Sequence, residues 1–206
     1  MKKRILIFSL LFTFSCLGLF AQTPFERLGQ KAMIAGDYNS AASYFEKAYA
    51  ADLGNMNALW LLGYAYYHAT EYRKSISTFD KLLALKPTEI VAYYYRGKAK
   101  FLLFGVIKDE FSNEKEALLI SATKDFSTAI DLSPDDMKLY QNRGLTYQQF
   151  GIYKSQKLSS GNNKSLAINL LNSSIADFQK VLSENNNRKD ILNQIDRSKQ
   201  VLMDIR

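Results

Sequence analysis

Beyond residue 22, hydrophobic and polar positions follow the period of an α-helix along most of the chain. Four segments share one pattern around a phenylalanine: AASYFEKAYA, SISTFDKLLAL, ATKDFSTAIDL and SIADFQKVLSE. Turn-forming stretches such as AGDYNS separate these segments, and the chain holds only three Pro and ten Gly. Because proline and glycine are the residues that interrupt helices most strongly, this pattern predicts an all-α fold.

Glycine and phenylalanine recur with a fixed period. Gly29, Gly63 and Gly97 follow one another at a constant interval, and the same interval separates Phe45 from Phe79. The spacing from each of the first three phenylalanines to the next glycine is constant, whereas the spacing from glycine to phenylalanine grows in the third unit and again in the fourth. The turn between units is therefore constant, and the turn inside a unit varies. An internal period of this kind predicts helical hairpins that stack as repeats.

The pattern resembles the tetratricopeptide repeat, a unit of about 34 residues with two antiparallel helices, A and B. The second unit carries the family's leucine, glycine, aromatic and proline positions as Leu62, Gly63, Tyr66, Tyr72, Phe79 and Pro87. The other units carry parts of the same pattern, including Gly36, Ala41, Ala122, Phe126, Gly144 and Phe178. The resemblance implies an α-solenoid of about four helical hairpins. The extra residues of the third and fourth units predict lengthened hairpins near 102–118 and 150–172 rather than loose loops.

The predicted organisation has three parts. Residues 1–21 form a signal peptide, and residues 22–186 form the repeat array, with units of about 22–55, 56–89, 90–136 and 137–186. Residues 187–206 form an amphipathic helix, with apolar side chains at positions 191, 195, 202 and 205 between charged ones. A solenoid needs an end element with a polar outer face, so we expect this last helix to cap the array.

The N-terminal segment predicts export. Three basic residues at positions 2–4 precede an uncharged apolar run of sixteen residues, which ends next to Ala21. This is the pattern of a cleaved secretory signal peptide, and an uncleaved membrane anchor is the alternative. Lipidation at Cys16 is a second alternative, although bulky Phe14 stands where a lipoprotein signal prefers a small residue. Because cleavage after Ala21 leaves no cysteine and so no disulfide, we expect the periplasm of a Gram-negative bacterium, with a membrane-anchored lipoprotein as the alternative.

Charge and motifs exclude several function classes. Without the signal peptide, 24 Lys and Arg stand against 20 Asp and Glu, a formal net charge of +4. Basic and acidic residues are interspersed, so nucleic acid is not an expected partner. The signatures of metalloproteases, serine hydrolases and phosphate-binding loops are absent from the sequence. With a single histidine and no mature cysteine, a metal site is not expected either. We therefore expect a non-enzymatic protein without a cofactor.

The segment WLLGYAYYH, residues 60–68, carries a stripe of aromatic residues beside its packed face. The third unit repeats this stripe at the same offsets from its glycine. The eight positions, here named the aromatic wall, are Trp60, Tyr64, Tyr67, His68, Tyr94, Tyr95, Lys98 and Phe101. The resemblance places them on the concave surface lined by the A helices, with polar positions such as Gln30, Gln141 and Gln148 at either end.

Two interpretations of the aromatic wall stay open. Amphipathic rings flanked by hydrogen-bonding groups suit a binding groove. Rings at these offsets also suit packing between neighbouring A helices. The groove interpretation favours an adaptor of the bacterial envelope that binds a peptide segment or helix of another envelope protein. The alternative is a glycan- or peptidoglycan-associated binding protein that uses the same rings, and a third interpretation is an architectural subunit whose long hairpins make the contacts.

Some members of the family hold chaperone C-termini through a clamp of lysine, asparagine and arginine on their A helices. The matching positions in this chain carry different residues: Glu26, Gln30, Leu61, Val91 and Tyr95. We therefore do not expect that class of partner. We expect membrane contact only through a lipid anchor at Cys16, and no motif indicates an oligomeric state.

Overall fold

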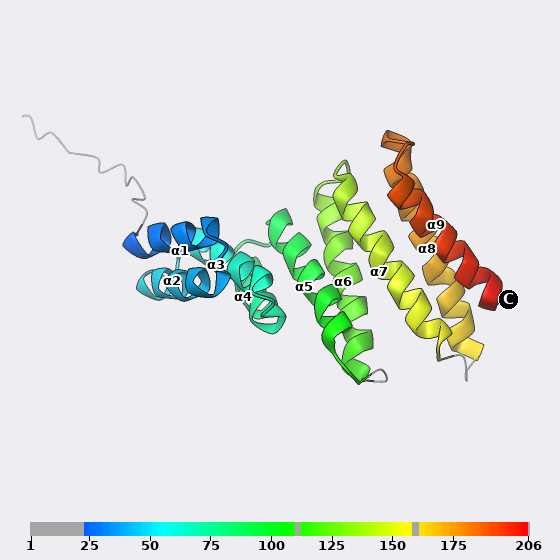
Figure 1. Ribbon diagram of the computed structural model, residues 1–206, viewed down its shortest axis with the longest axis horizontal. Helices are drawn as coiled ribbons and strands as arrows, with labels where there is room; N and C mark the ends of the chain where they lie inside the picture. The colour runs from blue at the N-terminus through cyan, green and yellow to red at the C-terminus, as the bar shows by residue number, and fades with distance from the viewer. Residues whose placement is uncertain (1–22, 110–111, 158–160, 206) are drawn as a thin grey trace, which may run out of the picture.

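A computed structural model describes residues 23–109, 112–157 and 161–205 (Figure 1). Within these ranges the chain forms helices and turns without a strand. The helices are α1 (Pro24–Ile34), α2 (Tyr38–Ala51), α3 (Met56–His68), α4 (Tyr72–Leu85), α5 (Ile90–Val106), α6 (Asn113–Leu132), α7 (Met137–Ser155), α8 (Gly161–Glu184) and α9 (Lys189–Ile205). None of the described helices combines the length and the apolar character that a membrane crossing needs. The predicted signal peptide and Cys16 lie outside the described residues.

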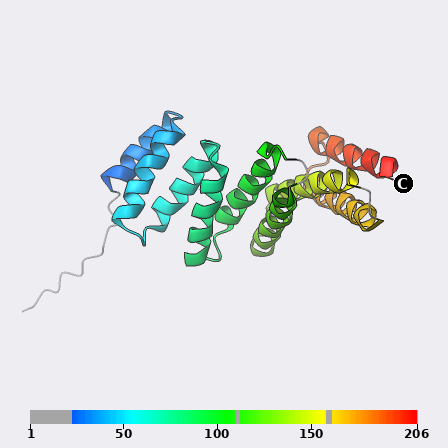
Figure 2. The ribbon, with the colours of Figure 1, turned by 90° about the horizontal axis from the view of Figure 1, so that it is seen from below.

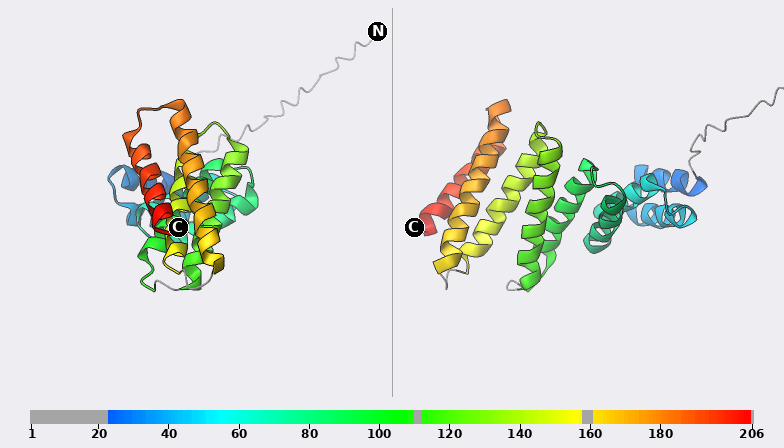
Figure 3. Two further views of the ribbon diagram at one scale, coloured as in Figure 1. Left: turned by 90° about the vertical axis from the view of Figure 1, so that its right-hand side faces the viewer. Right: turned by 180° about the vertical axis from the view of Figure 1, so that it is seen from behind.

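The first eight helices pair into four hairpins, α1 with α2, α3 with α4, α5 with α6, and α7 with α8 (Figures 1 and 3). The hairpins stack in chain order along the long axis of the molecule, and α9 lies on the last one. The direction of the helices turns along the stack, because the first hairpin and the last lie at a steep angle to each other in Figures 1 and 2. The predicted all-α solenoid of four hairpins with a C-terminal helix is confirmed.

The first helices of the hairpins lie on the inner side of the curve. From the second hairpin onward, α3 contacts α5, α5 contacts α7, and α7 contacts α9. Among the described residues, no comparable contact joins α2 to α4, α4 to α6 or α6 to α8. Because the first helices approach one another more closely than the second ones, the stack curves toward them, and they form its concave surface.

Local sequence sets where the helices begin and turn. Thr23 and Glu26 form a reciprocal capping box at the start of α1, with the Thr23 backbone N–H donating to the Glu26 carboxylate over 2.7 Å. Asp37 caps α2 by accepting from the Ser40 backbone N–H at 3.0 Å. The turn between α1 and α2 passes through Gly36, whose φ of 77° is the left-handed conformation that glycine adopts at little cost.

The repeated glycines and phenylalanines meet inside each hairpin. The four phenylalanine side chains at positions 45, 79, 126 and 178 are at most 1% exposed. Each ring lies against the glycine of its own hairpin, so that a Cβ built on Gly63 would stand only 2.9 Å from the Phe79 ring. The glycine period therefore has a steric cause, because any larger side chain would push the two helices apart.

The longer spacings of the third and fourth units appear as longer helices. Helices α5 to α8 have 17, 20, 19 and 24 residues, whereas α1 to α4 have 11 to 14. The added turns of the two hairpins pack against each other through a cluster that joins all four helices, made of Phe104, Leu119, Phe150, Tyr153 and Leu170. The prediction of two lengthened hairpins is confirmed.

Helix α9 covers an apolar face of α8 that would otherwise be exposed to solvent. Its predicted apolar positions Ile191, Ile195, Leu202 and Ile205 are all buried, at 1–6% exposed. The first two pack with Phe178 of α8, and the last two pack with Leu171. The charged residues between them face outward, as a cap requires.

Candidate binding surface

The aromatic wall lies on two neighbouring helices of the concave surface. Helix α3 carries its first four residues and α5 its last four. Seven of the eight side chains are half-buried, and the eighth, His68, is more exposed but still partly covered. The rings are therefore neither core nor free surface: part of each packs against a neighbour, and part faces outward.

Tyr95 contacts rings on both helices of the aromatic wall. Its ring contacts Trp60, Tyr64 and Tyr67 of α3, at centroid distances of 6.5, 5.1 and 5.2 Å and in edge-to-face geometry. Within its own helix it also contacts Tyr94, at 5.1 Å. Burial raises the pKa of the Tyr95 hydroxyl well above its usual range, with the neighbouring tyrosines adding to the shift. Tyr95 thus packs α5 against α3, as the packing interpretation predicts for this residue.

Lys98 places a positive charge in the middle of the rings. Its ammonium nitrogen lies 5.3 Å from the centroid of Tyr67, 5.2 Å from that of Tyr94 and 5.9 Å from that of Tyr95. Burial alone would lower its pKa, but the tyrosine hydroxyls around it, Tyr67 and Tyr94, outweigh that effect and raise the pKa. None of the ion pairs within the described ranges involves Lys98. Its charge is therefore held by rings rather than by a carboxylate.

His68 closes the wall toward the first hairpin. Its imidazole stacks on Tyr38 of α2 at 4.8 Å and contacts Tyr64 at 4.3 Å. Partial burial lowers its pKa, and the nearby charge of Lys98 lowers it further. This shift favours the neutral imidazole, which stands beside the tyrosines as an aromatic neighbour.

Two parts of the predicted concave surface are placed differently from the rest. Phe101 lies beyond the tyrosines and packs with the cluster of the lengthened hairpins, beside Phe104. At the α7 end, Gln148 is buried, and its amide donates to the Gln194 backbone carbonyl at 2.8 Å and to the Ser198 hydroxyl at 2.9 Å. The expected polar end of the concave surface is thus partly occupied by α9, which the sequence alone did not reveal.

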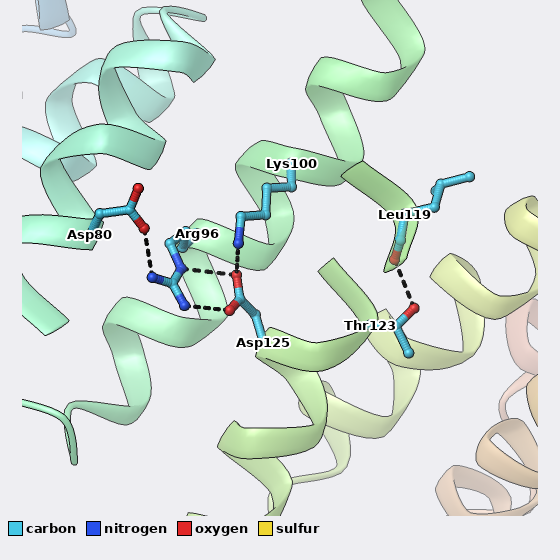
Figure 4. Close-up of polar contacts among 6 residues, drawn as sticks. All are labelled: Asp80, Arg96, Lys100, Leu119, Thr123 and Asp125. Atoms are coloured by element: carbon cyan, nitrogen blue, oxygen red, sulfur yellow. Dashed lines mark hydrogen bonds and ion pairs between the residues drawn. The ribbon is translucent and has the colours of Figure 1, made fainter. Parts of the chain in front are cut away.

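A buried charge network beside the wall was missed by the sequence analysis (Figure 4). Asp125 of α6 is 2% exposed and accepts two hydrogen bonds from Arg96 of α5, at 3.0 and 2.5 Å. Lys100 adds a third contact to the same carboxylate at 2.7 Å. Arg96 also reaches back to Asp80 of α4 at 2.6 Å, so one guanidinium joins three successive helices.

The fourth hairpin repeats this arrangement. Arg143 of α7 makes a two-pronged contact with Asp177 of α8, at 2.9 and 2.8 Å. In both hairpins the arginine directly precedes the repeat glycine, and the aspartate directly precedes the repeat phenylalanine. That recurrence of Arg-Gly and Asp-Phe is the signal that would have predicted the pairs.

The described residues offer no group of three or more histidine, cysteine, aspartate or glutamate side chains placed to hold a metal ion. What the surface provides instead is aromatic area with one unneutralised cation. Such an arrangement is chemically able to contact a ligand through packing, cation–π contacts and hydrogen bonds from tyrosine hydroxyls.

The comparisons with known proteins agree with this architecture. Residues 27–90 match the family model described as tetratricopeptide repeat. A thermophilic tetratricopeptide-repeat protein of Thermus thermophilus is similar in structure, with a TM-score of 0.53 and 20% identity, covering 89% of this chain and 100% of that one. The chain therefore has the fold of the tetratricopeptide-repeat proteins, and its first two hairpins carry the family's sequence pattern. No curated protein matches the sequence.

Two further structures are similar. MamA residues 41 to the end, from Desulfovibrio magneticus RS-1, has a TM-score of 0.55 and 17% identity, covering 87% of this chain and 92% of that one. The second tetratricopeptide-repeat domain of human RPAP3, solved with an HSP70 peptide, has a TM-score of 0.51 and 20% identity, covering 59% of this chain and 91% of that one. At sequence identities of 20% and 17%, these similarities show a shared fold only.

Proposed function

We propose that this protein is a non-enzymatic interaction adaptor of the bacterial envelope, which holds a peptide segment or helix of a partner protein on the aromatic wall. The observation that carries the proposal is the half-buried ring cluster around Lys98 on the concave side of the array. Similar folds solved with bound peptides, such as the human RPAP3 domain, support the general mode of binding. The predicted signal peptide supports the envelope location.

The chemistry of the wall favours a particular kind of partner segment. The rings of Trp60, Tyr64 and Tyr94 supply rigid apolar area at a low cost in conformational entropy. Lys98 supplies a cation that lies over tyrosine rings and forms no ion pair with a carboxylate of the described residues. A partner segment with an apolar or aromatic side chain next to an acidic residue would satisfy both features.

A chaperone tail held by the family's carboxylate clamp is a poorer fit. Glu26, at the first clamp position, is 4% exposed, and its carboxylate accepts from the side chains of Asn55 and Asn57 at 3.3 and 3.2 Å. It therefore repels a peptide carboxylate where the clamp would attract one. The peptide bound to RPAP3 ends in EEVD, and we do not propose that class of ligand for this chain.

The test is a capture experiment from envelope extract with the chain from Gln22 to Arg206 as bait. The double variant Trp60→Ala/Tyr94→Ala should lose a partner that the unmodified chain retains. The matched control is Phe25→Ala/Tyr44→Ala, which also removes two rings but on the first hairpin, away from the wall. Isothermal titration with the purified partner should show affinity at least tenfold weaker for the wall variant and unchanged for the control.

Other outcomes point elsewhere. Equal recovery on the wall variant and the unmodified chain would contradict the proposal and move the contacts to the lengthened hairpins. Retention on cell-wall polysaccharide, with a change in the fluorescence of Trp60, would favour the glycan-binding alternative. Both experiments need the circular dichroism spectrum of the wall variant, since loss of helicity would show that these rings are required for folding.

A further inference from the structure

A cavity of about 460 Å³ lies away from the tyrosines of the wall, between the end of α5, the start of α6 and the end of α7. Small-molecule sites in proteins have volumes of roughly 300–1,000 Å³, so it is large enough for an amino-acid side chain with its backbone. Rings and polar groups share its lining, chiefly Phe101, Phe104, Lys115, Gln149, Tyr153 and Gln156. The cavity lies between the added turns of the two lengthened hairpins.

Lys115 brings a nearly buried positive charge to this lining. The residue is only 9% exposed. Its ammonium nitrogen donates to the backbone carbonyl of Ile107 at 3.1 Å and lies 4.8 Å from the centroid of the Phe104 ring. A lysine ammonium has three N–H groups, so this contact leaves donors for a further partner.

No carboxylate of the described chain neutralises that charge. The two acidic neighbours of Lys115 in sequence are already engaged: Glu114 with Arg73 of α4, and Glu116 with Lys154 of α7 at 2.6 Å. None of the ion pairs found in residues 23–109, 112–157 and 161–205 includes Lys115. A cation with this little exposure attracts an anion more strongly than a solvated surface lysine does.

Two glutamines complete the polar side of the cavity. The side chains of Gln149 and Gln156 make no hydrogen bond to any described residue, so their amides remain available to a ligand. The Tyr153 hydroxyl is already held, since it accepts from Lys157 at 2.5 Å. The available groups are therefore one ammonium and two amides, set against the rings of Phe101 and Phe104.

We propose that this cavity is a second binding site, which takes a carboxylate carried on an apolar or aromatic residue of a peptide. Lys115 pairs with the carboxylate in a charge-assisted hydrogen bond, and the glutamine amides bind its second oxygen or the adjoining peptide group. Phe101 and Phe104 pack on the apolar part. The carboxylate is that of a C-terminal residue or of an aspartate or glutamate side chain. The site does not depend on the proposed role of the tyrosine rings.

The structure also provides a way to block the cavity without touching the core. Gly105 belongs to the lining, and a Cβ built on it meets no atom within 4 Å. A leucine at this position therefore has room, and we expect its side chain to fill part of the cavity, whereas an alanine should leave most of the space free. Gly105→Leu and Gly105→Ala form a matched pair for the test.

Binding is measured by two-dimensional NMR on the chain from Gln22 to Arg206, with three probes. They are N-acetylphenylalanine, its carboxamide, and the dipeptide N-acetyl-Phe-Glu-amide, whose only carboxylate is on a side chain. We expect saturable shifts of the Gln149 and Gln156 side-chain amide signals, in the millimolar range, with N-acetylphenylalanine or with the dipeptide. The carboxamide should bind at least tenfold more weakly. Which of the two acidic probes binds more tightly identifies the source of the carboxylate.

The variants separate the site from its alternatives. Lys115→Met and Gly105→Leu should each weaken binding at least tenfold, while Gly105→Ala and Trp60→Ala/Tyr94→Ala should keep it. The proposal is overturned if the carboxamide binds as well as the acidic probes. It is equally overturned if Lys115→Met lowers the thermal stability but leaves the affinity unchanged, since Lys115 would then serve only to cap α5. Loss of binding in the wall variant would place the carboxylate on the tyrosine wall instead.

Discussion

At the scale of single residues, Thr70 departs from the repeat that surrounds it. It stands one repeat period after Gly36, in the corresponding turn between α3 and α4, and its φ of 61° is left-handed as well. A left-handed conformation costs a residue with a Cβ about 1–2 kcal/mol, and threonine is among the residues that adopt it least readily. The turn geometry is thus imposed by the packing of α3 on α4, against the local preference of the residue.

Thr70→Gly should therefore stabilise the protein. Relief of the left-handed strain outweighs the extra entropy of glycine in the unfolded chain, which leaves a gain of about 0.5–1 kcal/mol in the free energy of unfolding. Urea denaturation followed by circular dichroism measures it. Gly36→Ala is the control of opposite sign, because it introduces the same strain, and a neutral or destabilising Thr70→Gly would contradict the argument.

The two ends of the Arg96 network should differ in their energetic weight. Asp125→Asn leaves Arg96 and Lys100 with less compensation in a buried site, which should lower the free energy of unfolding by about 3–5 kcal/mol. Asp80→Asn changes the same chemical group on the same arginine, but the Asp80 side chain is 54% exposed. An exposed pair contributes about 0–1 kcal/mol. Similar losses for the two variants in urea denaturation would show that burial does not decide the strength of these contacts.

His68 gives the wall a pH response of its own. Its folded-state pKa lies below the ordinary value of 6.5 because of partial burial and the charge of Lys98. The fold therefore favours the neutral imidazole, and this contribution to stability is complete above pH 6.5 and is lost as the pH falls through the lowered folded-state pKa. An NMR titration of the single histidine should show a midpoint below 6.5.

Lys98→Met is the matched variant for that titration. Removing the lysine charge should move the His68 midpoint upward, part of the way to its ordinary value, because the effect of burial remains. A midpoint that does not change on substitution would show that His68 and Lys98 do not interact, and would weaken the description of the wall as one cluster.

At the scale of elements, the hairpins owe their geometry to a few contacts that repeat. The phenylalanine of each B helix lies on the glycine of its A helix, and the next hairpin packs on the same cluster, as Leu62 and Tyr66 of α3 do on Phe45. A single hairpin cannot bury its second face, so each one depends on its neighbour. Helix α9 supplies that neighbour for α8.

The two faces of α9 should respond differently to substitution. Ile191→Ala removes a side chain that is 1% exposed and packed against Phe178, which should cost about 2–5 kcal/mol. Leu192→Ala removes a comparable side chain that is 42% exposed, and a surface change of this kind is usually within about 0.5 kcal/mol. Thermal unfolding of both variants makes the comparison. An equal loss at the two positions would mean that the outer face of α9 is also packed.

At the scale of the whole molecule, the sequence predicts a protein that leaves the cytoplasm. Intact-mass spectrometry of the protein recovered from cells of its source should find a mature chain beginning at Gln22, since the apolar run ends next to Ala21. A chain beginning at a lipid-modified Cys16 would replace the periplasmic prediction by a membrane-anchored one. Recovery of the unprocessed chain in the cytoplasm would contradict both.

The sequence by itself determined the helical class, the number of hairpins, the two lengthened units and the capping helix. It did so because close helix contact permits only small residues such as glycine, alanine or serine at particular positions, and stacking repeats that requirement along the chain. It also placed the aromatic residues of α3 and α5 on one surface, since helical offsets from the repeat glycine fix which face a side chain occupies.

Only the tertiary structure decided what those positions contact. Tyr95 is a packing residue because its ring contacts three rings of the preceding hairpin. Phe101 packs instead with the cluster of the lengthened hairpins. Lys115 became a nearly buried cation without an ion-pair partner in the described ranges because its acidic neighbours reach other helices. Such outcomes depend on distances between residues far apart in the chain. The helical pattern of one segment does not fix those distances, because they arise only when the hairpins stack.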